Sequence, residues 1–270
     1  MSWQDREAAP FGQEVWDAID ATARAAAEEV RAGRRVLQVV GPLGFGARAG
    51  IADDVPIAVE PERAHVHVPR IRPMPVLHRT VELGARTVEA NAQCAEPLVL
   101  VQIAEAARQI ARAEDRLLFD GVPEAGVAGL LGHPGALERT AGDWSDPGRA
   151  ADELLAALAA LDAAGRHGPY AVAVSPSRFY QLLRPHPGTS LTPFQQLQPA
   201  LAGGIVKAPS LADGAVVVVR SPSGPRAVLG QELTAAYDGR EGIFHQLSLV
   251  ESITLLPGEA GSVAILRGRA

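Results

Sequence analysis

The chain has 270 residues, of which 47% are apolar and 21% are charged, and its formal net charge is -6. This length and apolar content suffice for one large domain or two closely connected domains. The excess of 31 acidic over 25 basic side chains argues against nucleic acid as the main partner, because phosphate binding needs a basic face. The single cysteine, Cys94, excludes an internal disulfide and fits a reducing compartment. We interpret it as a buried or incidental thiol, because no histidine or basic cluster lies nearby to activate it.

No targeting or membrane segment is predicted. Residues Met1–Ala9 are polar and lack the apolar centre of a signal peptide. The longest dense apolar run, Pro97–Val101, is too short to cross a bilayer. We therefore expect no membrane partner and a cytoplasmic location.

A helix is predicted between Gly12 and Gly33, because Trp16, Ile19 and Ala23 recur at helical spacing with charged residues between them. Gly33 is expected to cap the C-terminal end of this helix. The apolar face of the helix has two interpretations: it packs into the core, or it leaves a groove for the apolar peptide of a partner.

A strand is predicted next, over residues 36–40, and Gly41, Gly44 and Gly46 end it. Their spacing, G-x-x-G-x-G, has neither the lysine of a phosphate-binding loop nor the spacing of the dinucleotide fingerprint. We interpret the three glycines as turn residues.

The segment from Gly50 to Pro75 is predicted to be a two-stranded arm, because it alternates weakly between apolar and polar residues and is rich in proline. An isolated hairpin is marginal in water, so we expect this arm to pack on another surface, such as a second subunit. His65 and His67 would share one strand face, but two ligands do not complete a metal site. We expect them to face solvent.

A long helix is predicted over 103–117, and three later helices are predicted where a capping residue precedes proline, at Asp146-Pro147, Ser175-Pro176 and Thr192-Pro193. The last of these helices is expected to continue to Leu201. Apolar runs bounded by turn residues predict short strands; these lie at 170–174, 205–208, 215–219, 227–229, 233–237, 246–255 and 263–266. The order of elements predicts an α+β chain without a βαβ repeat.

Few residues suggest catalysis. Ser175, Ser177, His186 and Asp162 could be combined into a triad, but the chain has no G-x-S-x-G turn and no recognisable oxyanion element. We interpret them as cap and loop residues. The adjacent carboxylates Glu114-Asp115 lie inside the predicted long helix, where such neighbours usually form a solvated or salt-bridged face.

Several short segments, in the same order as in the family, resemble the type 1 encapsulins, which are also described as linocin-like bacteriocins. Together the matches run from Ala9 to about Ile265. The matching segments are Ala9-Pro10, Trp16-x-x-Ile19-Asp20, Gly33-Arg34, Gly41-Pro42-x-Gly44, Glu114-Asp115, Phe119-x-Gly121, Gly126-Val127-x-Gly129-Leu130, Gly168-Pro169-Tyr170, Gly230-Gln231-Glu232-Leu233 with Tyr237, and Glu251-Ser252.

The resemblance implies the major-capsid fold of tailed phages, an α+β fold with a peripheral domain, an axial domain and an extended arm called the E-loop. It assigns the predicted arm to the E-loop, which would pair with a neighbouring subunit. The implied division is 1–40 as the N-terminal helix and first strand on the cargo side of the peripheral domain, 41–80 as the E-loop, 81–133 as the peripheral domain with the long helix, 134–225 as the axial domain, and 226–270 as strands that return to the peripheral domain.

The implied function is that of a shell component rather than an enzyme. About sixty copies would close into an icosahedral compartment, and cargo enzymes, a peroxidase or a ferritin-like protein related to iron storage or oxidative stress, would enter through a C-terminal targeting peptide. The peptide would dock on the N-terminal helix and nearby strands. Carried over by position, the docking residues are Trp16, Ile19, Ala23, Ala27, Val30, Arg34 and Leu233.

The resemblance also bears on pores and cofactors. The loop 184–189 would lie at the five-fold pore, with His186 as the pore histidine; an ordinary exposed loop histidine is the alternative. Some shells stack a flavin on a tryptophan, but the matching position here is about Arg86, so we expect no flavin, no other cofactor and no metal. A prophage major capsid protein is the alternative function, and a small hydrolase is a further one.

Overall fold

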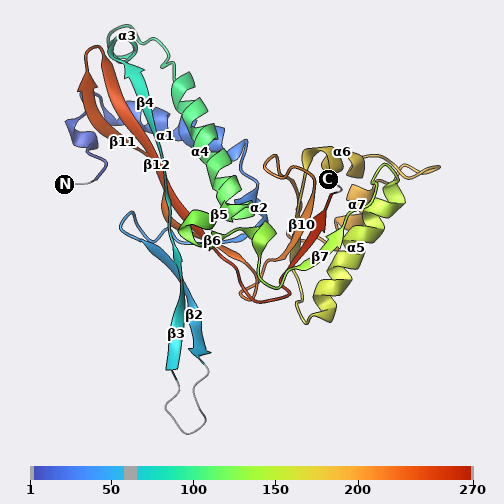
Figure 1. Cartoon of the computed structure of the whole chain (residues 1–270). Helices are drawn as coiled ribbons and strands as arrows, with labels where there is room; N and C mark the ends of the chain where they lie inside the picture. Colours follow the sequence, from blue (N-terminus) through green and yellow to red (C-terminus); the bar gives the residue numbers. More distant parts are fainter. Residues whose placement is uncertain (1–2, 58–65, 269–270) are drawn as a thin grey trace.

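The computed structural model describes residues 3–57 and 66–268, and these form two lobes and a projecting arm (Figure 1). In the first lobe, which we call the peripheral lobe, the strands are ordered β1-β11-β12-β4, with α1 and α4 packed beside them. Its elements are η1 (Arg6–Ala8), α1 (Gln13–Glu28), α2 (Gly33–Val36), β1 (Gln38–Val40), β4 (Val76–Gly84), α3 (Ala85–Cys94), α4 (Val101–Phe119), β11 (Arg226–Glu241) and β12 (Phe244–Leu256).

The second lobe, which we call the axial lobe, has strands in the order β7-β13-β10-β8-β9. Its elements are β7 (Leu137–Thr140), α5 (Pro147–Ala163), β8 (Tyr170–Val174), α6 (Pro176–Leu182), α7 (Pro193–Leu197), β9 (Ile205–Lys207), β10 (Gly214–Val219) and β13 (Val263–Arg267). The elements between α4 and β7 are β5 (Gly121–Val122), η2 (Pro123–Ala125), β6 (Val127–Ala128) and η3 (Leu130–Gly132).

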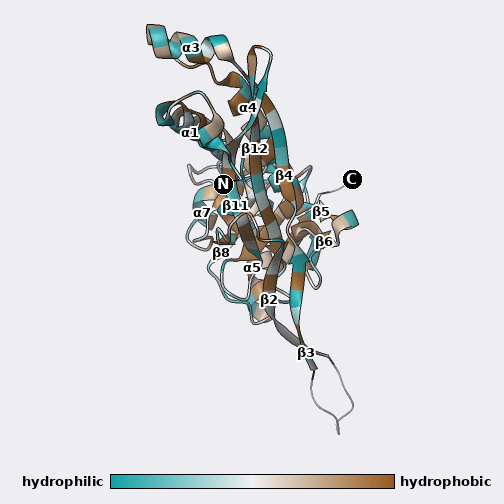
Figure 2. Ribbon diagram, turned by 90° about the vertical axis from the view of Figure 1, so that its left-hand side faces the viewer, coloured by the Kyte–Doolittle hydropathy of each residue, from teal (hydrophilic) through white to brown (hydrophobic). Residues whose placement is uncertain are grey.

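The arm consists of β2 (Ala49–Ile57) and β3 (Val66–Pro73), which pair in antiparallel fashion. Figures 1 and 2 show it extending away from both lobes. The base of the arm crosses β12 at Gly50, where an added Cβ would lie 2.8 Å from the methyl group of Thr254. Glycine is therefore required for this close approach. The predicted two-stranded arm is confirmed for the described residues, while His65 lies outside them.

Each lobe has its own apolar core. In the peripheral lobe, the apolar stripes of α1 and α4 pack on one face of the sheet, and Ile19, Ala107 and Leu247 are 0% exposed there. Figure 2 shows polar and apolar residues intermixed along β4, which is largely exposed, whereas β12 is buried at every position from Leu247 to Leu256. In the axial lobe, β8 and β10 are buried along their whole length beneath α5. A third core cluster joins the two lobes through Leu117, Leu118 and Val216, among others.

The structure corrects several predicted bounds. Gly33 does not cap the first helix, which ends near Glu29; instead it begins the short helix α2, where its Cα lies close to Leu118. Val36 is helical, so the first strand is limited to β1. The predicted strands 227–229 and 233–237 are parts of one strand, β11, whose register against β12 shifts at irregular positions. The helix predicted from Thr192 to Leu201 ends at Leu197.

The predicted division of the chain also changes in two places. The segment 41–80 includes the start of β4, which belongs to the peripheral sheet rather than to the arm. The segment 226–270 is divided between the lobes, because β11 and β12 lie in the peripheral sheet whereas β13 pairs with β10 and β7 in the axial sheet. Helix α3 and strands β4, β5, β6 and β7 are additional elements that the sequence patterns did not predict.

Candidate functional site

The arm exposes apolar side chains. Ile51 and Ile71 are directly paired between β2 and β3, and they are 66% and 58% exposed. Val68, on the other face of β3, is 38% exposed. Residues 67–71 of β3 are all exposed, which is the state expected of a surface that another molecule covers.

Most of the predicted docking residues lie in the core. Ile19 and Ala27 are 0% exposed, and Trp16 and Ala23 are nearly as buried, because α1 packs on α4 and β11. Of the two interpretations of this helix face, core packing therefore describes these four side chains. The remaining three, Val30, Arg34 and Leu233, are each partly exposed.

The N-terminal segment covers Trp16. Arg6 places its guanidinium 4.5 Å from the centre of the Trp16 ring and forms a bidentate ion pair with Asp20, both contacts at 2.8 Å. Arg6 also donates two hydrogen bonds to the carbonyl oxygen of Ala235 on β11. Phe11 also packs against Trp16, with 4.9 Å between the two ring centres. The side chain of Trp16 is thus covered by the chain's own N-terminal segment.

Arg34 belongs to a buried ionic cluster. Its Nε donates to Glu114 at 2.7 Å, its Nη1 donates to Glu232 at 2.9 Å, and its Nη2 donates to Glu251. Arg31, in the link between α1 and α2, donates to Glu114 at 2.8 Å and to Glu251 at 2.7 Å. All three guanidinium nitrogens of Arg34 donate within the chain, and these bonds use three of its five N–H groups.

The carboxylate pair of the long helix is buried. Glu114 is 0% exposed and is salt-bridged to both arginines, which agrees with one of the two predicted states but not with a solvated face. Asp115 is 2% exposed and accepts hydrogen bonds from the backbone N–H groups of Ala32 and Gly33. Burial raises the pKa of Asp115 to about 6, although these two N–H groups act in the opposite direction.

The structure does not assemble the triad considered above. Ser175 is fully buried and its Oγ accepts from the backbone N–H of Gly214. Asp162 instead accepts from Tyr170 at 2.5 Å and pairs with His167 at 2.9 Å. Burial, followed by Asp162 itself, raises the pKa of Tyr170 to about 12.

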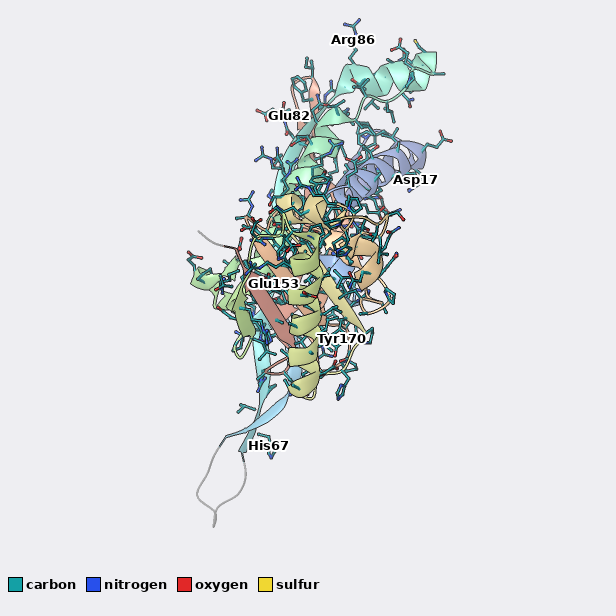
Figure 3. The ribbon with its side chains drawn as sticks, turned by 90° about the vertical axis from the view of Figure 1, so that its right-hand side faces the viewer. Asp17, His67, Glu82, Arg86, Glu153 and Tyr170 are labelled. Atoms are coloured by element: carbon teal, nitrogen blue, oxygen red, sulfur yellow. The ribbon has the colours of Figure 1, made fainter. Side chains whose placement is uncertain are left out.

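The other predicted polar positions lie apart from one another. His186 pairs with Gln196 at 3.0 Å in the loop between α6 and α7. Figure 3 shows His67 on the arm and Arg86 at the distant end of the peripheral lobe, pointing away from it. Cys94 is exposed at the end of α3, so the expectation of a buried thiol is wrong and the incidental alternative remains.

Within residues 3–57 and 66–268, no group of three or more His, Cys, Asp or Glu side chains is arranged to hold a metal ion. None of the helices in this part of the chain combines the length and the apolarity that a membrane crossing requires.

The arrangement of lobes and arm matches capsid structures. A virus-like particle from Pyrococcus furiosus aligns with a TM-score of 0.75 at 18% identity, covering 94% of this chain and 100% of that chain. The capsid of Myoviridae phage XM1 aligns with a TM-score of 0.62 at 12% identity, covering 86% and 90%. At these identities the likeness shows the fold alone, which is the major-capsid fold of tailed phages, as the sequence predicts.

Sequence comparison narrows this class to a family. The family model described as encapsulating protein for peroxidase matches residues 1–254. The type 1 encapsulin shell protein EncA of Myxococcus xanthus is 28% identical over 270 residues, covering 96% of this chain and 94% of that protein. A type 1 encapsulin shell protein of Rhodospirillum rubrum is 28% identical over 258 residues, covering 92% and 90%. The chain therefore belongs to the encapsulin shell protein family, whose members are structural proteins.

Proposed function

We propose that this chain closes into an icosahedral shell of about sixty copies, located in the cytoplasm, around a cargo enzyme. The description of the family names a peroxidase as the encapsulated protein. We extend the proposal to peroxidase or ferritin-like cargo that acts in iron storage or oxidative stress. The chemistry belongs to the cargo, while the shell supplies containment.

The observation that carries this proposal is the exposed arm. A two-stranded hairpin with Ile51 and Ile71 facing solvent loses the hydrophobic stabilisation that its side chains could provide. Fully burying one such side chain is worth roughly 1.5–3 kcal/mol. In a closed shell, symmetry repeats the same contact at every copy, so each arm would be covered once by a neighbour.

The test is the replacement of Ile71 by aspartate, with Ile71→Val as the matched control. We expect wild type and Ile71→Val to form hollow, uniform particles by size-exclusion chromatography and negative-stain microscopy. Ile71→Asp should keep its circular dichroism spectrum but remain as small species, because a charge would be buried at each contact. A wild-type protein that stays monomeric or dimeric would exclude the shell, and normal assembly of Ile71→Asp would exclude the arm as an assembly contact.

We further propose that the C-terminal peptide of the cargo docks where α2 approaches β11. The ion pair between Arg34 and Glu232 joins the two segments that carry Val30 and Leu233, and both of these apolar side chains are partly exposed. Trp16, Ile19, Ala23 and Ala27 would form the packed layer beneath this surface and would not contact the peptide directly. The loop that carries His186 would lie at the five-fold pore.

The docking test compares Leu233→Asp with Asp17→Ala in intact shells. Asp17 lies on the exposed side of α1 (Figure 3). The probe is a fluorescent protein fused to the C-terminal tail of a candidate cargo peroxidase. Losing a buried contact at this interface should cost more than about 1 kcal/mol of binding free energy. The loading of Leu233→Asp shells should therefore fall at least about fivefold, whereas Asp17→Ala shells should load normally. Equal loading of both variants would exclude this docking surface.

A further inference from the structure

Five ionisable side chains meet inside the peripheral lobe. Arg31 and Arg34 come from the link between α1 and α2 and from α2 itself, Glu114 and Asp115 from α4, and Glu251 from β12. The three carboxyl groups are at most 2% exposed, and the side chains of the arginines are 9% and 12% exposed. This cluster is the polar joint between the N-terminal helix and the rest of the lobe.

The charges of this joint do not balance. With every group ionised, two guanidinium groups face three carboxylates, which leaves a net charge of 2 - 3 = -1 in a site that water hardly reaches. Glu232 on β11 adds a further negative charge, but its side chain is 52% exposed and is therefore screened. Arg112 and Arg116, which line a cavity beside Asp115 with Val30, Pro209 and Ser210, are exposed on α4 and are screened in the same way. An uncompensated buried charge is costly, so one carboxyl group is expected to hold a proton.

The geometry singles out Glu251 as the group that holds it. Its Oε1 accepts from both Arg31 and Arg34, while its Oε2 is buried and has no hydrogen-bond partner among the described residues. Glu114, by contrast, uses one oxygen for each arginine, and Asp115 accepts two backbone N–H groups. Burial, followed by the neighbouring Glu114, raises the pKa of Glu251 to about 8, against the opposing effect of the two arginines.

We propose that the joint carries this proton on Glu251 at neutral pH, and that its loss in mild alkali loosens the attachment of α1 and α2 to α4 and β12. A carboxyl group whose pKa is higher in the folded than in the unfolded chain stabilises the fold below its unfolded pKa, and this stabilisation is lost as the pH rises through the folded pKa. The raised pKa of Asp115, about 6, acts in the same sense. The joint therefore loses stability as the pH rises, through Asp115 up to about pH 6 and through Glu251 up to about pH 8. The inference goes beyond the proposed cargo docking and does not depend on it.

The first experiment detects the proton directly in empty assembled shells. Infrared difference spectra between about pH 7.5 and pH 9.5, where Asp115 is ionised throughout, should show a protonated carboxyl band that disappears with a midpoint near pH 8. The band should be absent from Glu251→Gln, which keeps the neutral shape, and present in Glu232→Gln, which removes only the exposed carboxylate. If wild-type shells show no such band, the proposal is wrong, whether or not the variants fold.

The second experiment measures how often the link between α1 and α2 separates from Asp115. Hydrogen–deuterium exchange of the peptide that contains Ala32 and Gly33, corrected for the intrinsic pH dependence of exchange, reports opening of the link to Asp115. For one coupled proton, the opening constant should increase up to tenfold per pH unit from about pH 7 to about pH 8 and level off above it in wild type and in Glu232→Gln, whereas in Glu251→Gln it should stay flat over this range. The same pH dependence in Glu251→Gln as in wild type would assign the opening to another group.

Discussion

The replacement of Arg34 by methionine tests whether this residue holds the fold together rather than contacting cargo. Methionine has a similar reach but removes hydrogen bonds to Glu114, Glu232 and Glu251. Two of these acceptors are 0% exposed, so among the described residues Arg31 would remain as the only guanidinium in contact with them. Breaking a buried ion pair by removing one partner costs about 3–5 kcal/mol.

This cost predicts a measurable thermal shift. A change of 1 kcal/mol moves the melting temperature of a domain of this size class by about 2–4 °C, so Arg34→Met should melt about 6–20 °C below wild type. Removal of the cation also takes away one of the two charges that oppose the raised pKa of Glu251. The difference in melting temperature between wild type and Arg34→Met should therefore widen as the pH rises from about 6 to about 9.

The matched control is Arg35→Met. Arg35 is the next residue in α2, is exposed, and forms no ion pair with the described residues. A surface change of this kind is expected to stay within about 0.5 kcal/mol. The assay is differential scanning fluorimetry of assembled shells, with reporter loading measured in parallel. If Arg34→Met melts at the same temperature as Arg35→Met but its shells fail to load a reporter that carries the cargo tail, then Arg34 contacts the peptide and does not hold the fold together.

Three further predictions concern local structure. Gly121→Ala should destabilise the chain strongly, because the φ of Gly121 is +87° and the new Cβ would lie 2.4 Å from the carbonyl oxygen of Val127. Gly126→Ala should cost only about 1–2 kcal/mol, because Gly126 has a φ of +67° but open space around it. Equal losses of melting temperature in the two variants would contradict this ordering. Thr192→Ala should cost about 1 kcal/mol in thermal unfolding, because it removes the capping box at the start of α7; an unchanged melting temperature would show that the cap contributes nothing. Arg178 lowers the pKa of Asp213, so their ion pair stabilises the fold above the unfolded pKa of aspartate and is lost as the pH falls through the lower, folded value. A pH-stability profile of Asp213→Asn should accordingly lack part of the acid-induced loss that wild type shows.

Local signals predicted many of the elements. The sequence places β8 at Tyr170–Val174, and the structure has the same bounds. The predicted cap Asp146 accepts a hydrogen bond from the backbone N–H of Gly148 at the start of α5. Ser175 occupies the predicted position before α6, although its side chain makes no capping bond there. These features depend on neighbours within a few residues, and a sequence pattern contains those neighbours.

Other elements depend on distant partners. Strand β11 continues through 226–241 because β12 pairs with it on both sides of its register shifts, and such irregular pairing removes the period-two pattern by which a strand is recognised. The role of Gly33 follows from α4, because Asp115 accepts its backbone N–H and Leu118 lies against its Cα. The residues next to Gly33 in the sequence do not indicate either contact.

The predicted docking residues illustrate the same limit. Resemblance placed seven positions on one surface, but the packing of α1 against α4 and β11 buries four of them and leaves Val30, Arg34 and Leu233 partly exposed. A helical stripe shows which side chains share a face, and it does not show how much of that face another element covers.

The sequence by itself determined the α+β class, the long helix, the arm without a core of its own, and the family to which the chain belongs, because periodicity, capping residues and ordered short motifs are local properties. Only the tertiary structure decided that Glu114, Asp115 and Glu251 meet Arg31 and Arg34 in a buried joint. The electrostatic energy of a charge depends on its burial and on partners that lie far away in the chain, and neither is present in a residue's sequence neighbourhood.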